Sequence, residues 1–546
     1  MLKNYDTLHK YLCGIVLAFF ACCFVSCSDD DDATNSGYDP TKSVAVTDFI
    51  PKSGGVGQKL VIYGDNFGND KSKVNVTIGG KQAVLINVKN NGLYCFVPQG
   101  AYSEIQKDEQ NTETYYGEIK ITVGDEETGT QSAVASQKFV YEPKMVVGRL
   151  CGYRNEHDDQ GWHDGSFSEC TGFAADAFMK YDPLYPERLY IVYDNGSPGV
   201  QLVDFANETV TSILSKSKFE DKRLRTIDFT LDGQYMIVAT DRDDRGLNSP
   251  SVWAVKRNED GTFNNDSQAY IIASYKQCNG AVVHPQNGEL YFNSYENGQV
   301  FRLDLDYCLS VIESGDQWDP QVTHYQHQDP ESDSPFKQLF TIQDTSWEFN
   351  MTIHPSGDYA YINVINQHYM LRTDYDRANH RFAAPYIVAG GMKSPGWEDG
   401  VGTSARINRP YQGIFVKNQD YVDAGRSDVY DYYFCDNQNH AVRLLTPDGI
   451  IRTFAGRGSR TSAADNNIWG TDNGDLREVA RFRDPTGIAY NEDLNTFYIL
   501  DTVGRSLRTI AKETSDVEEP GNEGDTDDNN GGDSDTGEGS EETPAN

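Results

Sequence analysis

The sequence lacks the residue patterns that mark the common catalytic and metal sites. Its ten cysteines include no Cys-x-x-Cys pair and no Cys/His spacing of a metal site, and no GxSxG, HExxH, P-loop or Rossmann pattern occurs in a fitting context. Basic residues are scarce, because 47 Lys and Arg stand against 83 Asp and Glu. The formal charge of −36 argues against binding to a nucleic-acid backbone. The sequence therefore gives no catalytic motif, no metal-site motif, no cofactor and no nucleic-acid partner.

The chain also lacks an apolar run long enough to span a bilayer comfortably. The run over 11–25 follows Lys3 and His9 and suits a signal-peptide core. Its last residues before Cys27 resemble the bacterial lipobox, and Cys22 is a weaker rival site. The serine and four aspartates of 28–32 resemble the surface-export signal of Bacteroidetes lipoproteins. We expect 1–26 to be removed and Cys27 to be lipidated at the outer membrane, with 27–44 as an acidic linker on the cell surface. A transmembrane anchor is the alternative.

Lysine and arginine are absent from 513–546, which also holds few apolar residues. Such a segment cannot bury enough surface to fold, so we expect a disordered acidic tail. Six cysteines remain after the signal peptide and Cys27 are set aside. Cysteines this scattered in a large domain are mostly small buried hydrophobes. Cys151 and Cys170 are the pair close enough in sequence to consider as a disulfide.

Residues 45–142 alternate apolar and polar positions in short runs broken by Gly, Pro, Asn and Asp, which is typical of a small β-sandwich. Glycines there suit tight turns that need a positive φ. The segment resembles the IPT/TIG immunoglobulin-like family, from its opening VTDFIPKSGGVGQKLVIYGDNFG over 46–68 through 74–80 and 94–98 to 117–123. The resemblance implies an immunoglobulin-like domain that acts as a spacer.

An internal repeat organises residues 144–512. Six strongly β-prone runs recur, each after a turn and each with an apolar run upstream and downstream. They are Leu189–Tyr193, Tyr235–Thr240, Leu290–Ser294, Tyr359–Val364, Tyr430–Cys435 and Thr496–Leu500. Strands joined by turns in units of roughly fifty to seventy residues predict propeller blades. The expected fold class is all-β, an immunoglobulin-like sandwich followed by a six-bladed β-propeller.

The fifth and sixth units resemble the NHL repeat. The shared residues of the fifth are Ala389, Gly390, Asp399, Gly400, Ala405, Arg406, Pro410, Gly413, Ile414, Asp436, Asn437, Asn439, His440, Val442, Arg443, Asp448 and Gly449. Those of the sixth are Ala455, Gly456, Ala480, Arg481, Phe482, Pro485, Gly487, Ile488, Ala489 and Asp501. The first four units keep the strand spacing but lose most of the Asn-His-x-hydrophobic-Arg turn. The resemblance implies an NHL-type propeller.

The sixth unit runs into the acidic tail soon after 508–510 and so lacks an outermost strand. The run Met145–Gly152 is similar to the outer strands expected at 386–390 and 451–456, and it also leads into a Gly-rich loop. We infer that this run completes the last blade and closes the ring, which removes two exposed sheet edges.

Three of the loops between successive units carry tryptophan beside a carboxylate. These residues are Trp162 and Asp164, Trp397 and Asp399, and Trp469 and Asp472. Such loops cross one face of a propeller, so they are candidates for an aromatic platform that stacks on sugar rings. The alternative is that each Trp packs over its own loop, since large aromatics are mostly buried.

Two histidines occupy equivalent positions before proline in the third and fourth units. His284 and His354 are candidates to face the central channel and bind a metal. The other units place Asp182, Asp232, Lys417 and Asn491 near that turn, which instead suggests a solvent-exposed turn position.

From these features we expect a surface glycan-binding protein that captures polysaccharide for an uptake system. Its expected partners are a polysaccharide or oligosaccharide ligand and outer-membrane uptake proteins, and the hypothesis follows from the resemblance to spacer-plus-binding-domain lipoproteins of gut Bacteroidetes. A propeller lyase or hydrolase acting on the same polymers is an alternative, since propeller enzymes scatter their catalytic residues over several blades. A protein-interaction scaffold, the usual task of NHL propellers, is another.

Overall fold

The computed structural model describes residues 37–513, with gaps at 110–111, 126, 153–160, 195–197, 296, 326–333, 343–347 and 458–467. The expected signal peptide, the lipidation site and residues 514–546 of the acidic tail lie outside the described residues, whereas Glu513, predicted as the first residue of the tail, is buried and bonds Lys144. The described chain forms two compact units that meet in sequence between Pro143 and Lys144. Among the described residues, no helix combines the length and apolar character needed to cross a membrane.

The first unit is a β-sandwich of three small sheets. Their strand orders are β1-β3-β7-β6, β11-β10-β4-β5 and β2-β12-β9-β8. Alternate residues of β3 and β10 are buried because successive strand side chains point to opposite faces. The strands are β1 (Ala45–Ile50), β2 (Ser53–Gly54), β3 (Lys59–Asp65), β4 (Val74–Ile78), β5 (Lys81–Gln82), β6 (Val84–Lys89), β7 (Gly92–Phe96), β8 (Glu104–Lys107), β9 (Glu113–Gly117), β10 (Ile119–Asp125), β11 (Gly129–Val134) and β12 (Phe139–Tyr141).

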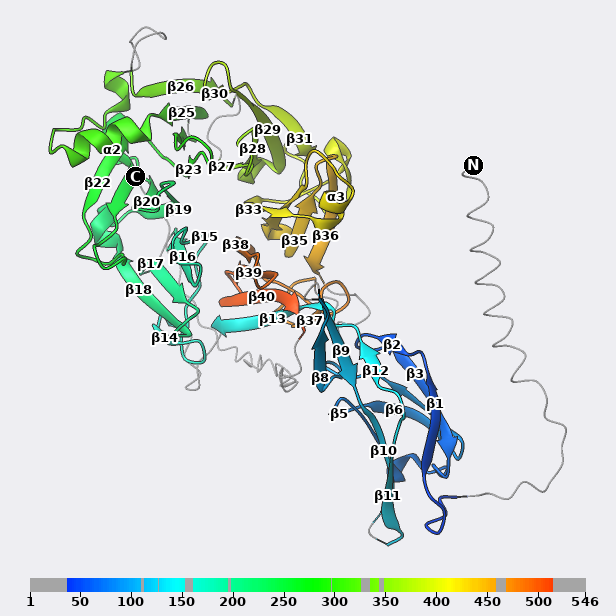
Figure 1. Cartoon of the computed structure of the whole chain (residues 1–546). Coiled ribbons are helices and arrows are strands. Elements are labelled where there is room, and N and C mark those ends of the chain that lie inside the picture. The colour runs from blue at the N-terminus through cyan, green and yellow to red at the C-terminus, as the bar shows by residue number, and fades with distance from the viewer. Residues whose placement is uncertain are drawn as a thin grey trace, which may run out of the picture. The chain divides into compact units, whose positions relative to one another are not determined.

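The second unit is a propeller whose described residues form six antiparallel sheets around a ring (Figure 1). The innermost strands contact one another in the order β15, β19, β23, β27, β33, β38 and again β15. A ring of six sheets that returns to its first member confirms the predicted six-bladed propeller.

Blades one to three hold the first half of the ring. Blade 1 has β15 (Ala177–Tyr181), β16 (Arg188–Tyr193), β17 (Gly199–Asp204) and β18 (Thr209–Ser215), with β14 (Gly165–Ser166) beside β18. Blade 2 has β19 (Arg223–Phe229), β20 (Tyr235–Asp241), β21 (Pro250–Lys256) and β22 (Ala269–Ser274). Blade 3 has β23 (Ala281–Val283), β24 (Leu290–Ser294), β25 (Gln299–Leu303) and β26 (Phe336–Thr341).

Blades four to six complete it. Blade 4 has β27 (Phe349–Ile353), β28 (Tyr359–Val364) and β29 (Tyr369–Asp376), with β30 (Arg381–Phe382) and β31 (Tyr386–Gly390) both beside β29. Blade 5 has β33 (Pro410–Lys417), β34 (Tyr430–Asp436), β35 (Ala441–Leu445) and β36 (Ile450–Gly456), with β32 (Gly400–Val401) beside β36. Blade 6 has β38 (Pro485–Asn491), β39 (Thr496–Asp501), β40 (Ser506–Lys512) and β13 (Met145–Gly152), with β37 (Gly474–Asp475) beside β13.

The ring closes as predicted from the missing outer strand of the sixth unit. Strand β13, from the start of the unit, pairs antiparallel with β40 from its end. Val147 and Cys151 of β13 are buried in the process. The edge of β40 is therefore covered by a strand more than three hundred residues earlier in the chain, as the partner pair Met145 and Lys512 shows.

The six runs predicted from the sequence are the second strands of the six blades. None of their ends differs from the observed strand by more than one residue. The short strands β14, β32 and β37 were not predicted, nor were the two described α-helices, α2 (Leu305–Glu313) and α3 (Gln419–Asp423). Helix α2 begins after Asp304, whose side chain accepts the backbone N–H of Tyr307.

Candidate functional site

The three tryptophan loops each run to the outer edge of the blade that follows them. There they form the short strands β14, β32 and β37, which pair with β18, β36 and β13. Asp164 accepts the backbone N–H of Ser212 at 2.7 Å, and Asp399 accepts that of Thr453 at 3.1 Å. In the third loop the equivalent residue before glycine is Asn473, not the predicted Asp472. These side chains anchor their loops to the neighbouring strand.

A long buried side chain lies under each anchor. Arg443 donates to Asp399 at 2.8 Å, Arg508 donates to Asn473 at 2.7 Å, and the shorter Gln201 donates to Asp164 at 3.2 Å. The carboxylates of Asp164 and Asp399 are therefore engaged with their own blades. Asp472 lies instead 3.5 Å from Arg481.

Two of the three tryptophans keep an exposed surface. Trp397 and Trp469 are both 38% exposed. The Arg457 guanidinium lies 3.8 Å from the ring centroid of Trp397, and that of Arg483 lies 4.6 Å from the ring of Trp469. Arg477, from the loop of Trp469, also lies 5.8 Å from the Trp397 ring. The two loops therefore adjoin.

Trp162 has a different environment. It is half-buried and packs edge-on against the buried Tyr193, with the ring centroids 4.9 Å apart. It also covers Gly172, where an added Cβ would lie 2.4 Å from the indole. Gly172 has a φ of +122°, so both its backbone and its surroundings favour glycine. Trp162 is thus part of the packing of its own blade.

A charged cluster lies at the loop-side ends of the inner strands of blades 1, 2 and 4. At its centre is Arg225, which is 2% exposed and donates to Asp194 at 2.7 Å. Arg223 also donates to Asp194, at 2.6 Å, and lies 3.1 Å from Asp241. Glu348 lies 3.4 Å from Arg225. The two arginines are thus shared among three carboxylates, so each charge in this buried network has a partner.

Asp176 extends this cluster toward blade 5. Its carboxyl group accepts the hydroxyl of the buried Tyr411 at 3.2 Å. Burial raises the pKa of Asp176, and the nearby charge of Asp194 adds to this, while Arg409 and Arg225 act in the opposite direction. Asp176 therefore holds its proton to higher pH than an exposed aspartate.

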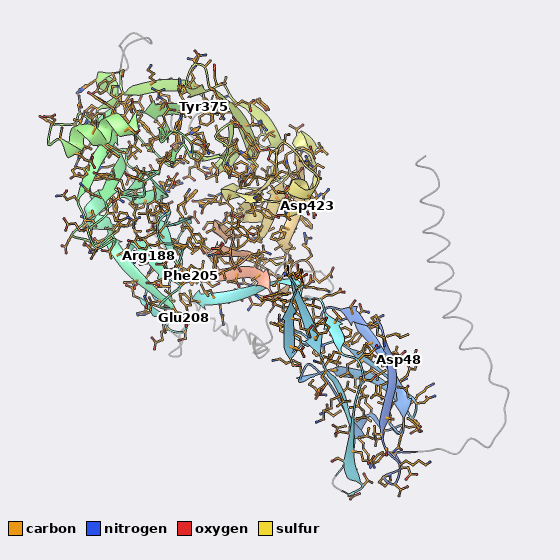
Figure 2. All side chains as sticks on the ribbon, in the orientation of Figure 1. Asp48, Arg188, Phe205, Glu208, Tyr375 and Asp423 are labelled. Carbon is orange, nitrogen blue, oxygen red and sulfur yellow. The ribbon has the colours of Figure 1, made fainter. Side chains whose placement is uncertain are left out.

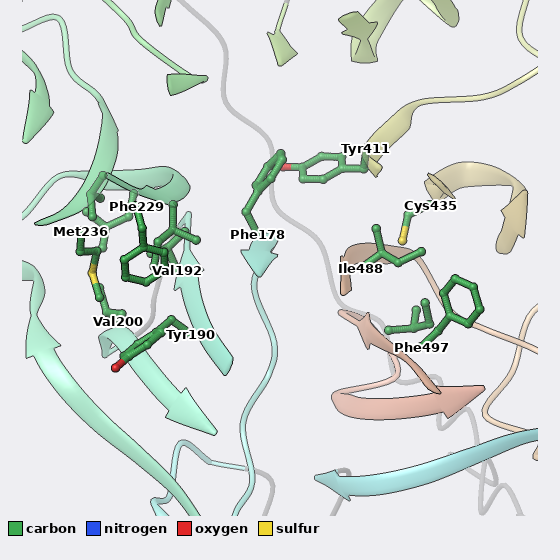
Figure 3. Packing of buried hydrophobic residues seen from close by; sticks show 14 of the residues in the cluster. Phe178, Tyr190, Val192, Val200, Phe229, Met236, Tyr411, Cys435, Ile488 and Phe497 are labelled. Carbon is green, nitrogen blue, oxygen red and sulfur yellow. The ribbon is translucent and has the colours of Figure 1, made fainter. Parts of the chain in front are cut away.

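Side chains fill the centre of the ring just beyond these charges. Phe178 of β15 and Tyr411 of β33 point toward each other (Figure 3), and their ring centroids are 5.4 Å apart. The Gln412 amide donates to Met179 O at 2.7 Å and accepts from Met179 N at 2.9 Å and from Ile488 N at 3.1 Å. The inner strands of blades 1, 5 and 6 are thereby tied together across the axis.

The two histidines considered for a metal lie in packed positions. His284 and His354 are 2% and 5% exposed, so the expected solvent-exposed turn was wrong. His284 packs against Tyr375, a residue of β29 in blade 4 (Figure 2), and its Nε2 lies 3.1 Å from Gly357 O. His354 stacks on Tyr359. Each imidazole packs between two neighbouring blades. Within the described ranges, no three His, Cys, Asp or Glu side chains are grouped to hold a metal ion.

Comparison with known proteins gives one match to a family model and several to solved structures. Residues 45–141 match the IPT/TIG domain. A putative phosphatase from Bacteroides thetaiotaomicron is 50% identical, with a TM-score of 0.77 over 88% of this chain and 100% of that chain. An auxiliary nutrient binding protein from the same species is 38% identical, with a TM-score of 0.72 over 87% and 99%. One from Bacteroides ovatus is 32% identical, with a TM-score of 0.60 over 88% and 100%.

This chain belongs to the family of these Bacteroides proteins. The IPT/TIG domain occupies its first unit, and the likeness to the solved members extends over both units. No curated protein matches the chain. The descriptions of the family members name two classes of function, a putative phosphatase and nutrient binding proteins.

Sequence reasoning missed the charged cluster of this Bacteroides family member. Its residues come from four places in the chain, and none forms a motif with its neighbours. One signal was present, since Arg223 and Arg225 take alternate positions at the start of a β-prone run, which places two charges on one face.

Proposed function

We propose that the protein is a cell-surface lipoprotein, anchored through Cys27, that captures glycan for an uptake system. The propeller binds the glycan and the IPT/TIG domain is the spacer. The observation that carries the proposal is the likeness to two auxiliary nutrient binding proteins over 99% and 100% of their chains. We also propose that the propeller is of the NHL type. The His440 ring of the NHL-like turn accepts the backbone N–H of Asp484 at 3.3 Å, and His368 accepts that of Arg409 at 3.2 Å.

The proposed site is the surface of the two adjoining loops that carry Trp397 and Trp469. An indole with a guanidinium against it and a third of its surface exposed offers an apolar face of fixed orientation. A sugar ring can stack on the indole through its own apolar face. Asp472 is the nearby carboxylate that we propose as a hydroxyl acceptor, because it is half exposed and lies as far as 3.5 Å from Arg481. We leave Asp164, Asp399 and Trp162 out of the contact surface, because their side chains are engaged with their own blades.

A polysaccharide hydrolase is the second candidate function. The observation in its favour is the buried Asp176, whose raised pKa suits proton donation. The two candidates differ in what happens to the polymer, since a binding protein leaves its length unchanged.

Affinity electrophoresis of residues 37–513 against a polysaccharide panel tests the proposal. We expect retardation by at least one polysaccharide with no new reducing ends. Trp397→Ala and Trp469→Ala should each weaken binding by about 1–3 kcal/mol with the melting temperature almost unchanged. Trp162→Ala is the matched control, and it should cost about 3 kcal/mol of stability while affinity is kept. Unchanged binding in both Trp397→Ala and Trp469→Ala would place the site elsewhere, and new reducing ends would favour the hydrolase.

A further inference from the structure

Several described arginines of the two proposed binding loops form no ion pair within 4 Å. Several exposed or half-buried arginines elsewhere in the described propeller, such as Arg188, Arg302 and Arg426, form ion pairs, whereas Arg381 and Arg452 do not. Among the described residues, four arginines of the loops before β33 and β38 form none, and they are Arg406, Arg409, Arg477 and Arg483. Four such arginines lie on these two loops in a chain with nearly twice as many acidic as basic residues.

These four guanidinium groups keep unused hydrogen-bonding capacity. Arg406 donates to the carbonyls of Thr403 and Ala405 at 2.7 and 2.8 Å. Arg477 donates to Thr453 O at 3.4 Å, and the Nε atoms of Arg409 and Arg477 have no hydrogen-bond partner but are buried, so only their terminal N–H groups can reach a ligand. Arg483 is exposed and contacts the Trp469 ring. Since a guanidinium has five N–H donors, most of those in this group are left for solvent or a ligand.

Most carboxylates of the same loops are already engaged. Asp399 bonds Arg443, Asp472 faces Arg481, and Asp475 accepts the backbone N–H groups of Arg477 and Glu478 at 3.0 Å. Asp484 lies 3.0 Å from His440. The carboxylates of Glu398 and Glu478 are exposed, and the four guanidinium groups outnumber them. The formal charge of −36 acts weakly here, because charges more than about 8 Å away are largely screened at physiological salt.

We infer that this loop surface takes an anionic glycan, whose carboxylate or sulfate groups bond the arginines while Trp397 and Trp469 stack on its sugar rings. Planar guanidinium groups suit both anions, since they offer two parallel N–H donors. The inference rests on the proposed function and names the class of glycan for the same site.

Titration of the purified full chain with three hexasaccharides tests the inference. The probes are a uronate oligomer (hexagalacturonate), a sulfated one (chondroitin sulfate hexasaccharide) and a neutral one (mannohexaose). We expect at least one anionic probe to bind about tenfold or more tightly than the neutral probe, with an affinity that falls as salt rises. Whether uronate or sulfate binds more tightly identifies the anion.

Charge-removing variants locate the contact. Arg483→Gln and Arg477→Gln should each lower the affinity for the anionic probe about tenfold and leave the affinity for the neutral probe unchanged. Arg381→Gln is the matched control, because Arg381 on β30 is also exposed and lies outside these loops. It should change neither affinity. Arg483 is exposed, so Arg483→Gln decides the test if Arg477→Gln unfolds.

Two results would overturn the inference in different ways. If the neutral probe binds as tightly as the anionic ones, and Trp397→Ala still weakens it, the site is a glycan site of another class and the proposed function stands. If no probe and no polysaccharide of the panel binds, the proposed function itself fails.

Discussion

At the scale of the residue, blade 5 and blade 6 each contain a buried ion pair between two of their neighbouring strands. Arg443 lies 2.9 Å from Asp436, and Arg508 lies 3.3 Å from Asp501. All four side chains are buried. Burial raises the pKa of Asp501 to about 6, although Arg508 acts to lower it. Desolvation therefore outweighs the attraction in this pair.

The raised pKa of Asp501 predicts a pH-dependent contribution to the free energy of unfolding. The folded pKa lies above the unfolded value, so the folded state binds the proton more readily between about pH 4 and 6, and stability falls as pH rises through that window. Between pH 4.5 and 7 this term is about 2 kcal/mol in the wild type and absent in Asp501→Asn. Urea unfolding of both proteins at the two pH values measures it. A variant with the same pH slope as the wild type would contradict the assignment.

At the scale of the element, the strand β13 decides whether the ring is closed. It covers β40 along its length and also pairs with β37. The end of β40 is fixed to it further, because Lys144 and Glu513 exchange two hydrogen bonds of 3.0 Å. A strand at the edge of a sheet leaves a row of unpaired backbone groups when its neighbour is removed.

Removal of β13 should therefore destabilise the propeller. A fragment that starts at Asn155 lacks the strand, and one that starts at Glu142 keeps it. We expect the shorter fragment to lose about 3 kcal/mol or more, since it loses the burial of Val147 and Cys151 and exposes the edges of β40 and β37. Thermal unfolding of the two fragments provides the comparison. Equal melting temperatures would mean that β13 does not close the ring energetically.

The strands of the blades were largely predictable, and the elements that complete the site were not. Runs such as Tyr359–Val364 and Leu290–Ser294 were predicted without error because a buried second strand is mostly apolar and lies between turns. The two-residue strands β32 and β37 have no such pattern, since they form only where a loop meets the edge of the next blade. These short strands position Trp397 and Trp469.

At the scale of the whole molecule, the proposed function depends on an anchor that lies outside the described residues. Cys27→Ala should release the protein from membranes, because a lipid-modified cysteine supplies the attachment. Replacement of the four aspartates at 29–32 by Ala should keep the lipid but leave the protein protected from added protease. Fractionation and protease shaving of intact cells measure both effects. If the Cys27→Ala protein stays with the membrane, either Cys22 is the lipidated residue or the apolar segment is an anchor.

The sequence by itself determined the architecture of this protein. Period-two alternation, recurrent apolar strands and the missing outer strand of the last unit specified a sandwich and a closed six-bladed ring, because these patterns reflect local propensity and burial. The tertiary structure alone decided which charged and aromatic side chains meet. Arg225 meets Asp194, Asp241 and Glu348, and Trp397 meets Arg477, only when the strands and blades have packed together. Burial and ion pairing depend on neighbours distant in sequence, so no local pattern could separate the packed Trp162 from the exposed Trp397 and Trp469.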